Sequence, residues 1–152
     1  MRNSLTSGDT SRCWDNALSL LSHRMRSQKE LAACLQQKGY GQELIEKTIN
    51  RLQELKLIDD RQFAVAWVRS HDTKSQRLLK LELKMKGISE EDLSTVDMVD
   101  DLQKAELLVC KKMHILDTAD RQSRRKIYGY LQRRGFDYDV IMTVLDRFLP
   151  ET

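Results

Sequence analysis

The sequence predicts an all-α protein made of three tandem repeats, each containing three helices. Its 152 residues include one proline and six glycines, and 32% of them are charged, which suits helices and provides few turns. A glycine that follows a basic residue and precedes an aromatic or aliphatic one occurs three times, 48 residues apart, at Gly39, Gly87 and Gly135. Such a period is typical of stacked helical units. We therefore expect an elongated, curved helical array of the right-handed type.

The residues around each glycine predict a helix on both sides of it. The eighth and fourth residues before the glycine, about two turns and one turn away, are aliphatic: Leu31 and Leu35, Leu79 and Leu83, and Ile127 and Leu131. The fourth residue after it is acidic and the sixth aliphatic, at Glu43 and Ile45, Glu91 and Leu93, and Asp139 and Ile141. We expect a flexible tail at residues 1–9 and repeats at 10–58, 59–100 and 101–152.

The first repeat has the clearest helix signals. Its first apolar stripe, spaced i, i+3, i+4 and i+7, consists of Trp14, Ala17, Leu18 and Leu21. That helix should begin near Ser11. Ser27 and Glu30 have the spacing of a capping box at the start of a second helix. Gly39 should end this helix in a left-handed conformation, and a third amphipathic helix follows the turn.

The second repeat opens at Asp59 and Asp60, carboxylates that favour a helix N-terminus, and Asp59 is most simply a cap. A middle helix from about Ser75 to Gly87 should follow. Ser89 begins a third helix, which is the weakest because Leu93, Val96 and Val99 alternate with aspartates.

The third repeat should bury Ala105 and Leu108 on its first helix. A connection at about residues 116–120 is longer than its equivalent in the first repeat. Its last helix carries an apolar stripe and ends before Pro150, because proline cannot continue a helix.

The composition excludes several classes of protein. The three cysteines, Cys13, Cys34 and Cys110, are odd in number and widely spaced, so they predict neither a disulfide framework nor a structural zinc site. His114 lies one turn from Cys110, but two ligands make a poor metal site. No apolar run approaches the roughly 18 residues that span a bilayer, and known enzyme motifs are absent. We expect a cytoplasmic protein with no cofactor, metal or catalytic residue.

Charge is strongly separated along the chain. Residues 89–106 hold seven acidic side chains and one lysine, whereas residues 119–134 hold six basic side chains and one aspartate. Such separation fits electrostatic docking to a charged partner, although solvated helix faces give the same pattern.

Basic side chains gather on two predicted helices. Arg77, Lys80 and Lys84 fall within about 60° of one another on the middle helix of the second repeat. By the same count, Arg121, Arg125 and Tyr128 share a face of the middle helix of the third repeat. Arginines with an interleaved tyrosine suit phosphate contact and base stacking, and they suit a carboxylate-rich protein surface equally. The alternative interpretation is that these basic residues only stabilise a helix C-terminus and keep the helix surface solvated. The candidate binding residues are Lys74, Arg77, Lys80, Lys84, Arg121, Arg124, Arg125, Tyr128, Arg133 and Arg134.

Several of these stretches resemble the RecX regulators of the bacterial RecA recombinase. The segment Ile58-Asp59-Asp60-Arg61-Gln62-Phe63-Ala64 is similar to the most diagnostic stretch of that family. Glu82-Leu83-Lys84-Met85-Lys86-Gly87-Ile88 and Leu131-Gln132-Arg133-Arg134-Gly135-Phe136 resemble its turns in the second and third repeats. The family commonly has glycine where this chain has residues 72–76, so the bend there should differ.

The resemblance implies a protein that binds in the groove of the RecA filament and inhibits its recombinase, ATPase and coprotease activities. It would thus act in DNA repair, recombination and the SOS response, without catalysis, as a monomer that contacts single-stranded DNA directly or through RecA. The family motif implies structural roles for Asp59, Asp60, Phe63, Gly39, Gly87 and Gly135. The residues alone fit two other hypotheses, a general helical-repeat adaptor and a nucleic-acid-binding module not specific to RecA.

Overall fold

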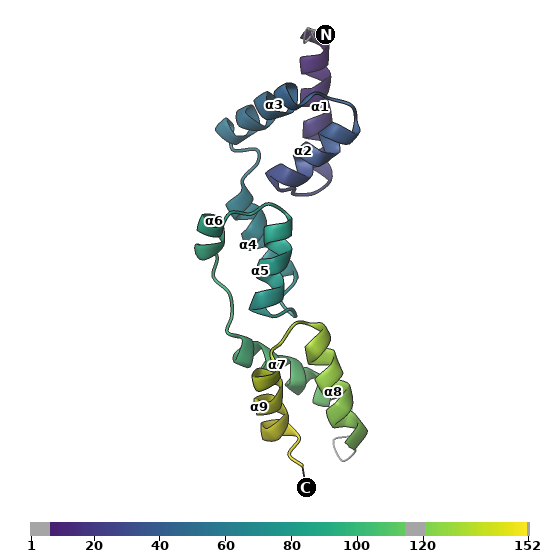
Figure 1. Ribbon diagram of the computed structural model, residues 1–152, viewed down its shortest axis with the longest axis vertical. Helices are drawn as coiled ribbons and strands as arrows, with labels where there is room; N and C mark the ends of the chain where they lie inside the picture. Colours follow the sequence, from purple (N-terminus) through teal and green to yellow (C-terminus); the bar gives the residue numbers. More distant parts are fainter. Residues whose placement is uncertain (1–6, 115–120, 152) are drawn as a thin grey trace. The chain divides into compact units, whose positions relative to one another are not determined.

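The computed structural model describes residues 7–114 and 121–151, and within these ranges it contains nine α-helices and no strand (Figure 1). The predicted all-α class is confirmed. The helices are α1 (Ser7–His23), α2 (Gln28–Gln37), α3 (Gln42–Glu54), α4 (Asp60–Ser70), α5 (Gln76–Met85), α6 (Glu90–Ser94), α7 (Asp101–Met113), α8 (Arg121–Arg133) and α9 (Tyr138–Phe148). Three consecutive helices form each repeat.

Two helix bounds differ from the prediction. α1 begins at Ser7, so residues 7–9, which we expected in the tail, are helical. α6 ends at Ser94 after five residues, because Val96 and Val99 alternate with aspartates and offer no continuous apolar stripe. The long connection predicted at residues 116–120 lies outside the described residues.

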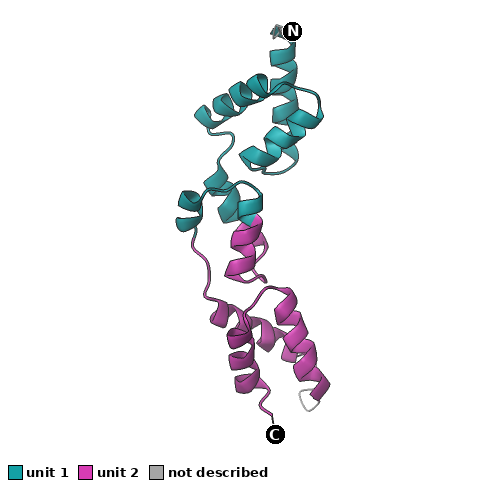
Figure 2. Cartoon of the chain, in the orientation of Figure 1, with its two compact units in different colours: residues 1–66, 83–96 teal, residues 67–82, 97–152 magenta. Residues whose placement is uncertain are grey.

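The described chain forms two compact units (Figure 2). The first unit contains Met1–Ala66 and Leu83–Val96, and the second contains Trp67–Glu82 and Asp97–Thr152. The boundary passes through α4 and α5, so the middle repeat contributes one part to each unit.

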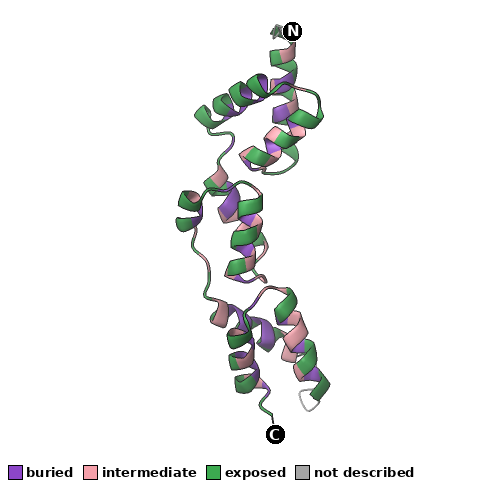
Figure 3. Cartoon of the chain, in the orientation of Figure 1, coloured by how far each residue is buried: buried purple, intermediate pink, exposed green. Residues whose placement is uncertain are grey.

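The core of the first repeat lies where α1, α2 and α3 meet (Figure 3). Cys13 and Ala17, one turn apart on α1, are fully buried, whereas Leu18 is 37% exposed. We had expected Leu18 in the buried stripe, but the contacts of α1 with both other helices centre that stripe on the smaller residues. The buried core residues are Cys13, Ala17, Leu31, Leu35, Leu44, Ile45, Ile49, Leu52 and Ile58.

The core of the third repeat, in the second unit, is built in the same way from α7, α8 and α9. Ala105 and Leu108 are buried as predicted. Full burial of a leucine or isoleucine side chain contributes about 1.5–3 kcal/mol, so this cluster is a main source of stability for the three helices. Its buried members are Ala105, Leu108, Val109, Ile127, Leu131, Phe136, Ile141, Val144, Leu145 and Leu149.

The three repeated glycines have the same conformation. Gly39, Gly87 and Gly135 have φ angles of 93°, 85° and 86°, in the left-handed region that glycine enters without penalty. In each turn, the residue after the glycine donates its N–H to the carbonyl five residues earlier, as Ile88 does to Leu83 at 3.0 Å. This pattern is the Schellman motif, and it satisfies carbonyls that the helix end leaves open. The predicted helix ends are confirmed.

The last two glycine turns each pack against the start of an earlier helix. Within the first unit, Ser27 Oγ at the start of α2 donates to the Lys86 carbonyl at 2.7 Å, and an ideal Cβ on Gly87 would lie 2.7 Å from Lys29 Cβ. Within the second unit, the N–H of Ser75 donates to the Arg134 carbonyl at 2.9 Å. We call these contacts the first and second joints.

A carboxylate completes each joint. Asp60 Oδ1 accepts the N–H of Gln28 at 2.9 Å, and Asp101 Oδ1 accepts the N–H of Gln76 at 2.8 Å. In the second joint, Lys104 is a buried residue, and its Nζ donates to the Lys74 carbonyl at 2.7 Å. Each carboxylate thereby satisfies a backbone donor at the open N-terminal end of a helix.

Candidate functional site

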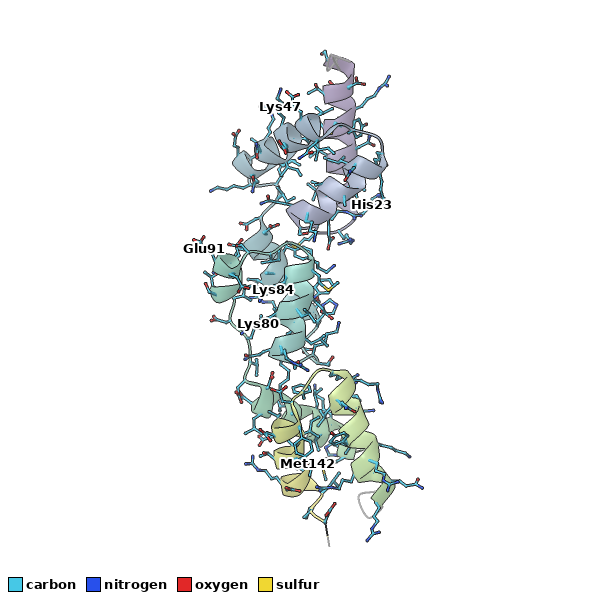
Figure 4. The ribbon with its side chains drawn as sticks, viewed as in Figure 1. His23, Lys47, Lys80, Lys84, Glu91 and Met142 are labelled. Atoms are coloured by element: carbon cyan, nitrogen blue, oxygen red, sulfur yellow. The ribbon has the colours of Figure 1, made fainter. Side chains whose placement is uncertain are left out.

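α5 carries three predicted binding residues at intervals of three and four, and all three are exposed. Lys80 has no ion-pair partner among the described residues. Arg77 Nε lies 3.8 Å from Asp137, and Lys84 Nζ lies 2.6 Å from Glu90 Oε1. Exposed pairs of this kind hold their partners weakly. Figure 4 labels Lys80 and Lys84 on this helix, whose exposed cations are thus available to a partner.

Lys74 is engaged inside the second unit. Its Nζ donates to Glu82 Oε1 at 2.6 Å, and Glu82 Oε2 accepts from Trp67 Nε1 at 3.0 Å. The Trp67 ring stacks on His71 with centroids 3.9 Å apart. Burial alone would raise the pKa of Glu82, but the bonds from Lys74 and Trp67 outweigh it and lower that pKa. Lys74 therefore ties the α4–α5 connection to α5.

The basic residues of α8 divide into two groups. Arg121 and Arg125 are exposed, lie one turn apart and have no ion-pair partner in the part of the chain that the structure describes. Tyr128, which we expected on the same face, packs partly buried against the third-repeat core. Arg121 and Arg125 thus offer two adjacent, available guanidinium groups.

Arg124 is occupied within its own repeat. Its side chain is only 16% exposed, and its Nη2 lies 2.7 Å from Asp146 Oδ1. Its Nη1 donates to the Leu149 carbonyl, and its Nε lies 3.6 Å from Glu151. The guanidinium ties α8 to the end of α9, so it is less available to a partner than those of Arg121 and Arg125.

The cations at the end of α8 lie close to the helix itself. The Arg134 guanidinium carbon lies 3.6 Å from the Tyr130 ring centroid, and Lys112 Nζ lies 4.4 Å from the same ring. Arg134 Nη1 also donates to the Tyr130 carbonyl at 3.3 Å. Arg133 remains exposed, with Nη1 close to Gly129. Arg133 is therefore more available to a partner than Arg134.

The predicted motif residues have structural contacts. Asp59 Oδ1 accepts the N–H groups of Arg61 and Gln62, which confirms the predicted cap. Phe63 is buried. Asp60 belongs to the first joint instead of capping its own helix. Burial raises the pKa of Asp60 more than its hydrogen bond from Gln28 lowers it.

Sequence reasoning missed two residues of this kind, Lys104 and Glu82. Lys104 precedes Ala105 and lies one turn before Leu108, so its position on the buried stripe of α7 was a usable signal. Burial lowers the pKa of Lys104, partly offset by Asp101 and Asp72. Glu82 had a weaker signal, as the one acidic residue of α5.

The described residues contain no group of three or more histidine, cysteine or acidic side chains placed to hold a metal ion. None of the described helices is long and apolar enough to cross a membrane.

Comparison with known proteins relates each repeat to one family. Models of the first, second and third three-helix domains of RecX match residues 13–52, 59–96 and 99–145. The regulatory protein RecX of Chlorobium phaeobacteroides (strain BS1) is 37% identical over 146 residues, which cover 91% of this chain and 95% of the relative. The RecX protein of Amycolatopsis mediterranei (strain U-32) is 33% identical over 147 residues, covering 91% of this chain and 82% of the relative.

A solved structure agrees with the sequence comparisons. The crystal structure of RecX from Lactobacillus salivarius superposes with a TM-score of 0.71 at 26% identity, covering 94% of this chain and 98% of that one. The match spans all three repeats, and the sequence relatives span them too. The chain therefore belongs to the RecX family of regulatory proteins.

Proposed function

We propose that this protein binds the RecA nucleoprotein filament and inhibits its recombinase, ATPase and coprotease activities. Membership of the RecX family, whose relatives are named regulatory proteins, supports a regulatory role. The observation that carries the binding proposal is a set of exposed cations without ion-pair partners among the described residues, namely Lys80, Arg121 and Arg125.

These three side chains all lie in the second unit. Arginine donates paired hydrogen bonds to carboxylate or phosphate oxygens, and lysine contributes a compact charge. Both groups are found on a nucleoprotein filament. The protein would then act by occupying filament surface, without catalysis, as a cytoplasmic monomer. Arg77 and Arg133, in the same unit, would add contacts, because the pair of Arg77 with Asp137 is exposed and Arg133 is itself exposed.

Co-sedimentation with RecA filaments on single-stranded DNA tests this proposal. Three exposed pairs worth about 0.5 kcal/mol each amount to roughly tenfold in affinity. The triple variant Lys80→Glu, Arg121→Glu, Arg125→Glu should therefore bind at least about tenfold more weakly while remaining folded. The matched control Lys38→Glu, Arg69→Glu, Lys111→Glu changes the net charge equally at exposed residues outside the proposed surface, and it should bind much like the parent. Equal losses in both variants would reject the assignment.

A nucleic-acid-binding module unrelated to RecA predicts a different result. Such a protein would bind single-stranded DNA without RecA, with affinity falling steeply as salt rises, because phosphate contacts release counterions. Retained binding to RecA filaments under salt conditions that abolish binding to bare DNA would favour the RecA proposal. Equal salt sensitivity, with no gain from RecA, would favour the alternative.

A further inference from the structure

A pocket of about 620 Å³ opens between α1 and α3 of the first repeat, wholly inside the first unit. It has the size of a small-molecule site. None of its lining residues belongs to the basic surface described above. Its lining includes Trp14 and Asp15 from α1 and Leu44, Lys47, Thr48 and Arg51 from α3. Figure 4 labels Lys47 on α3.

The Trp14 indole and the Arg51 guanidinium face each other across part of this pocket. The guanidinium carbon lies 5.9 Å from the ring centroid. One stacking contact needs about 3.5–4 Å, and two contacts with a planar ring between them need about 7 Å. The separation of the guanidinium from the indole is thus too large for direct stacking, and it is about 1 Å too small for a planar ring to stack on both groups. Arg51 is exposed, so a small side-chain movement would admit a flat ring.

The chemistry of the pocket separates into an apolar part and a cationic part. Leu44 is buried, and the Thr48 hydroxyl already donates to the Leu44 carbonyl at 2.8 Å. Because the Leu44 side chain is apolar and the Thr48 hydroxyl is already hydrogen-bonded, this part of the pocket suits an apolar ring. Lys47 and Arg51 lie one helical turn apart on α3 and can reach one anionic group together. The pair of Lys47 with Glu43, at 3.3 Å, is exposed on both sides and therefore weak.

We propose that this pocket binds an aromatic base that carries a phosphate, as in a nucleotide. The base stacks between Trp14 and the face of the Arg51 guanidinium, and the phosphate binds Lys47 and the N–H edge of Arg51. Asp15, at the rim, is placed to accept from an amino group of the base. The same chemistry is present in single-stranded DNA and in a free nucleotide, so the test includes both. The inference does not depend on RecA and uses residues outside the proposed filament surface.

The test measures binding of a short, fluorescently labelled oligothymidylate and, separately, of ATP to the full chain in the absence of RecA. Base stacking on an aromatic residue gives about 5- to 150-fold in affinity. Trp14→Leu should lose binding in that range, whereas Trp14→Phe should keep most of it because a ring remains. Thermal unfolding of both variants checks that the first repeat is intact.

The cationic part has its own readout. Lys47→Gln with Arg51→Gln removes two phosphate contacts, so the slope of log affinity against log salt for the oligonucleotide should become shallower by about 1.4. Arg12→Gln with Lys38→Gln removes the same charge from exposed residues of the same repeat that do not line the pocket, and it should leave the slope unchanged.

Binding of the oligonucleotide with both expected losses supports the proposal with DNA as the source of the base. Binding of ATP alone with those losses supports it with a free nucleotide as the source. Absence of binding by both probes overturns it. Loss on charge removal without loss in Trp14→Leu also overturns it, because an acidic partner needs the cations but not the indole. Equal losses of binding in the pocket variant Lys47→Gln with Arg51→Gln and in the control Arg12→Gln with Lys38→Gln would also overturn the proposal.

Discussion

Replacing each of the three repeated glycines by alanine separates backbone strain from packing at the joints. All three have φ angles between 85° and 93°, so an added Cβ costs each turn roughly 1–2 kcal/mol through left-handed strain. The surroundings differ. A Cβ on Gly39 would meet nothing within 4 Å, whereas one on Gly135 would lie 2.6 Å from Ser75 Oγ and 2.9 Å from Leu78 Cβ.

That difference sets the expected magnitudes. Gly39→Ala should cost only the strain of about 1–2 kcal/mol. Gly87→Ala and Gly135→Ala should cost about 1–3 kcal/mol more, because Lys29 Cβ and Leu78 Cβ are attached directly to helix backbone and cannot move aside easily. At roughly 2–4 °C per kcal/mol, thermal unfolding measured by circular dichroism resolves the two classes. Equal midpoints for Gly39→Ala and Gly135→Ala would refute the packing of the second joint.

Two further predictions concern single contacts. The raised pKa of Asp60 means that the folded state holds this proton more tightly than the unfolded state, so its contribution to stability falls as pH rises from the ordinary value of 3.8 through the raised pKa. Asp60→Asn, which keeps an acceptor for Gln28, should remove this loss of stability, whereas Asp60→Ala should destabilise the protein at every pH. Denaturation of the parent and both variants at a series of pH values shows whether the stability of the parent falls more with pH than that of Asp60→Asn. Arg124→Ala should lower the free energy of unfolding by about 1–3 kcal/mol, because it leaves charged and backbone acceptors unpaired. Replacing the neighbouring exposed residue, in Arg125→Ala, should change it by no more than about 0.5 kcal/mol. Urea unfolding measures both, and similar losses would contradict the role of Arg124 in tying α8 to the end of α9.

The helix ends were predictable from sequence because they depend on local chemistry. Gly39, Gly87 and Gly135 each follow a basic residue at the end of an apolar stripe, and the left-handed conformation follows from neighbours a few residues away. Only half of the predicted capping box at Ser27 forms. Ser27 Oγ accepts from Glu30 N as expected, but the Glu30 carboxylate pairs with Arg24 and Lys86 and not with the backbone N–H of Ser27.

The joints were less predictable because their partners are distant in sequence. Asp60 has the local signal of a cap, yet it accepts from Gln28, 32 residues earlier. Arg124 and Arg125 are adjacent and chemically identical, and only the packing of α9 on α8 distinguishes the paired guanidinium from the available one. The Trp14 pocket combines residues of α1 and α3 whose proximity follows from the repeat core.

The central proposal is tested most directly by the rate of ATP hydrolysis by RecA on single-stranded DNA as this protein is titrated in. We expect hydrolysis to slow progressively up to stoichiometric amounts, with the triple variant of Lys80, Arg121 and Arg125 requiring at least about tenfold more protein for the same effect. An unchanged rate at stoichiometric protein, under conditions where the filament is intact, would contradict the proposal that this protein inhibits RecA.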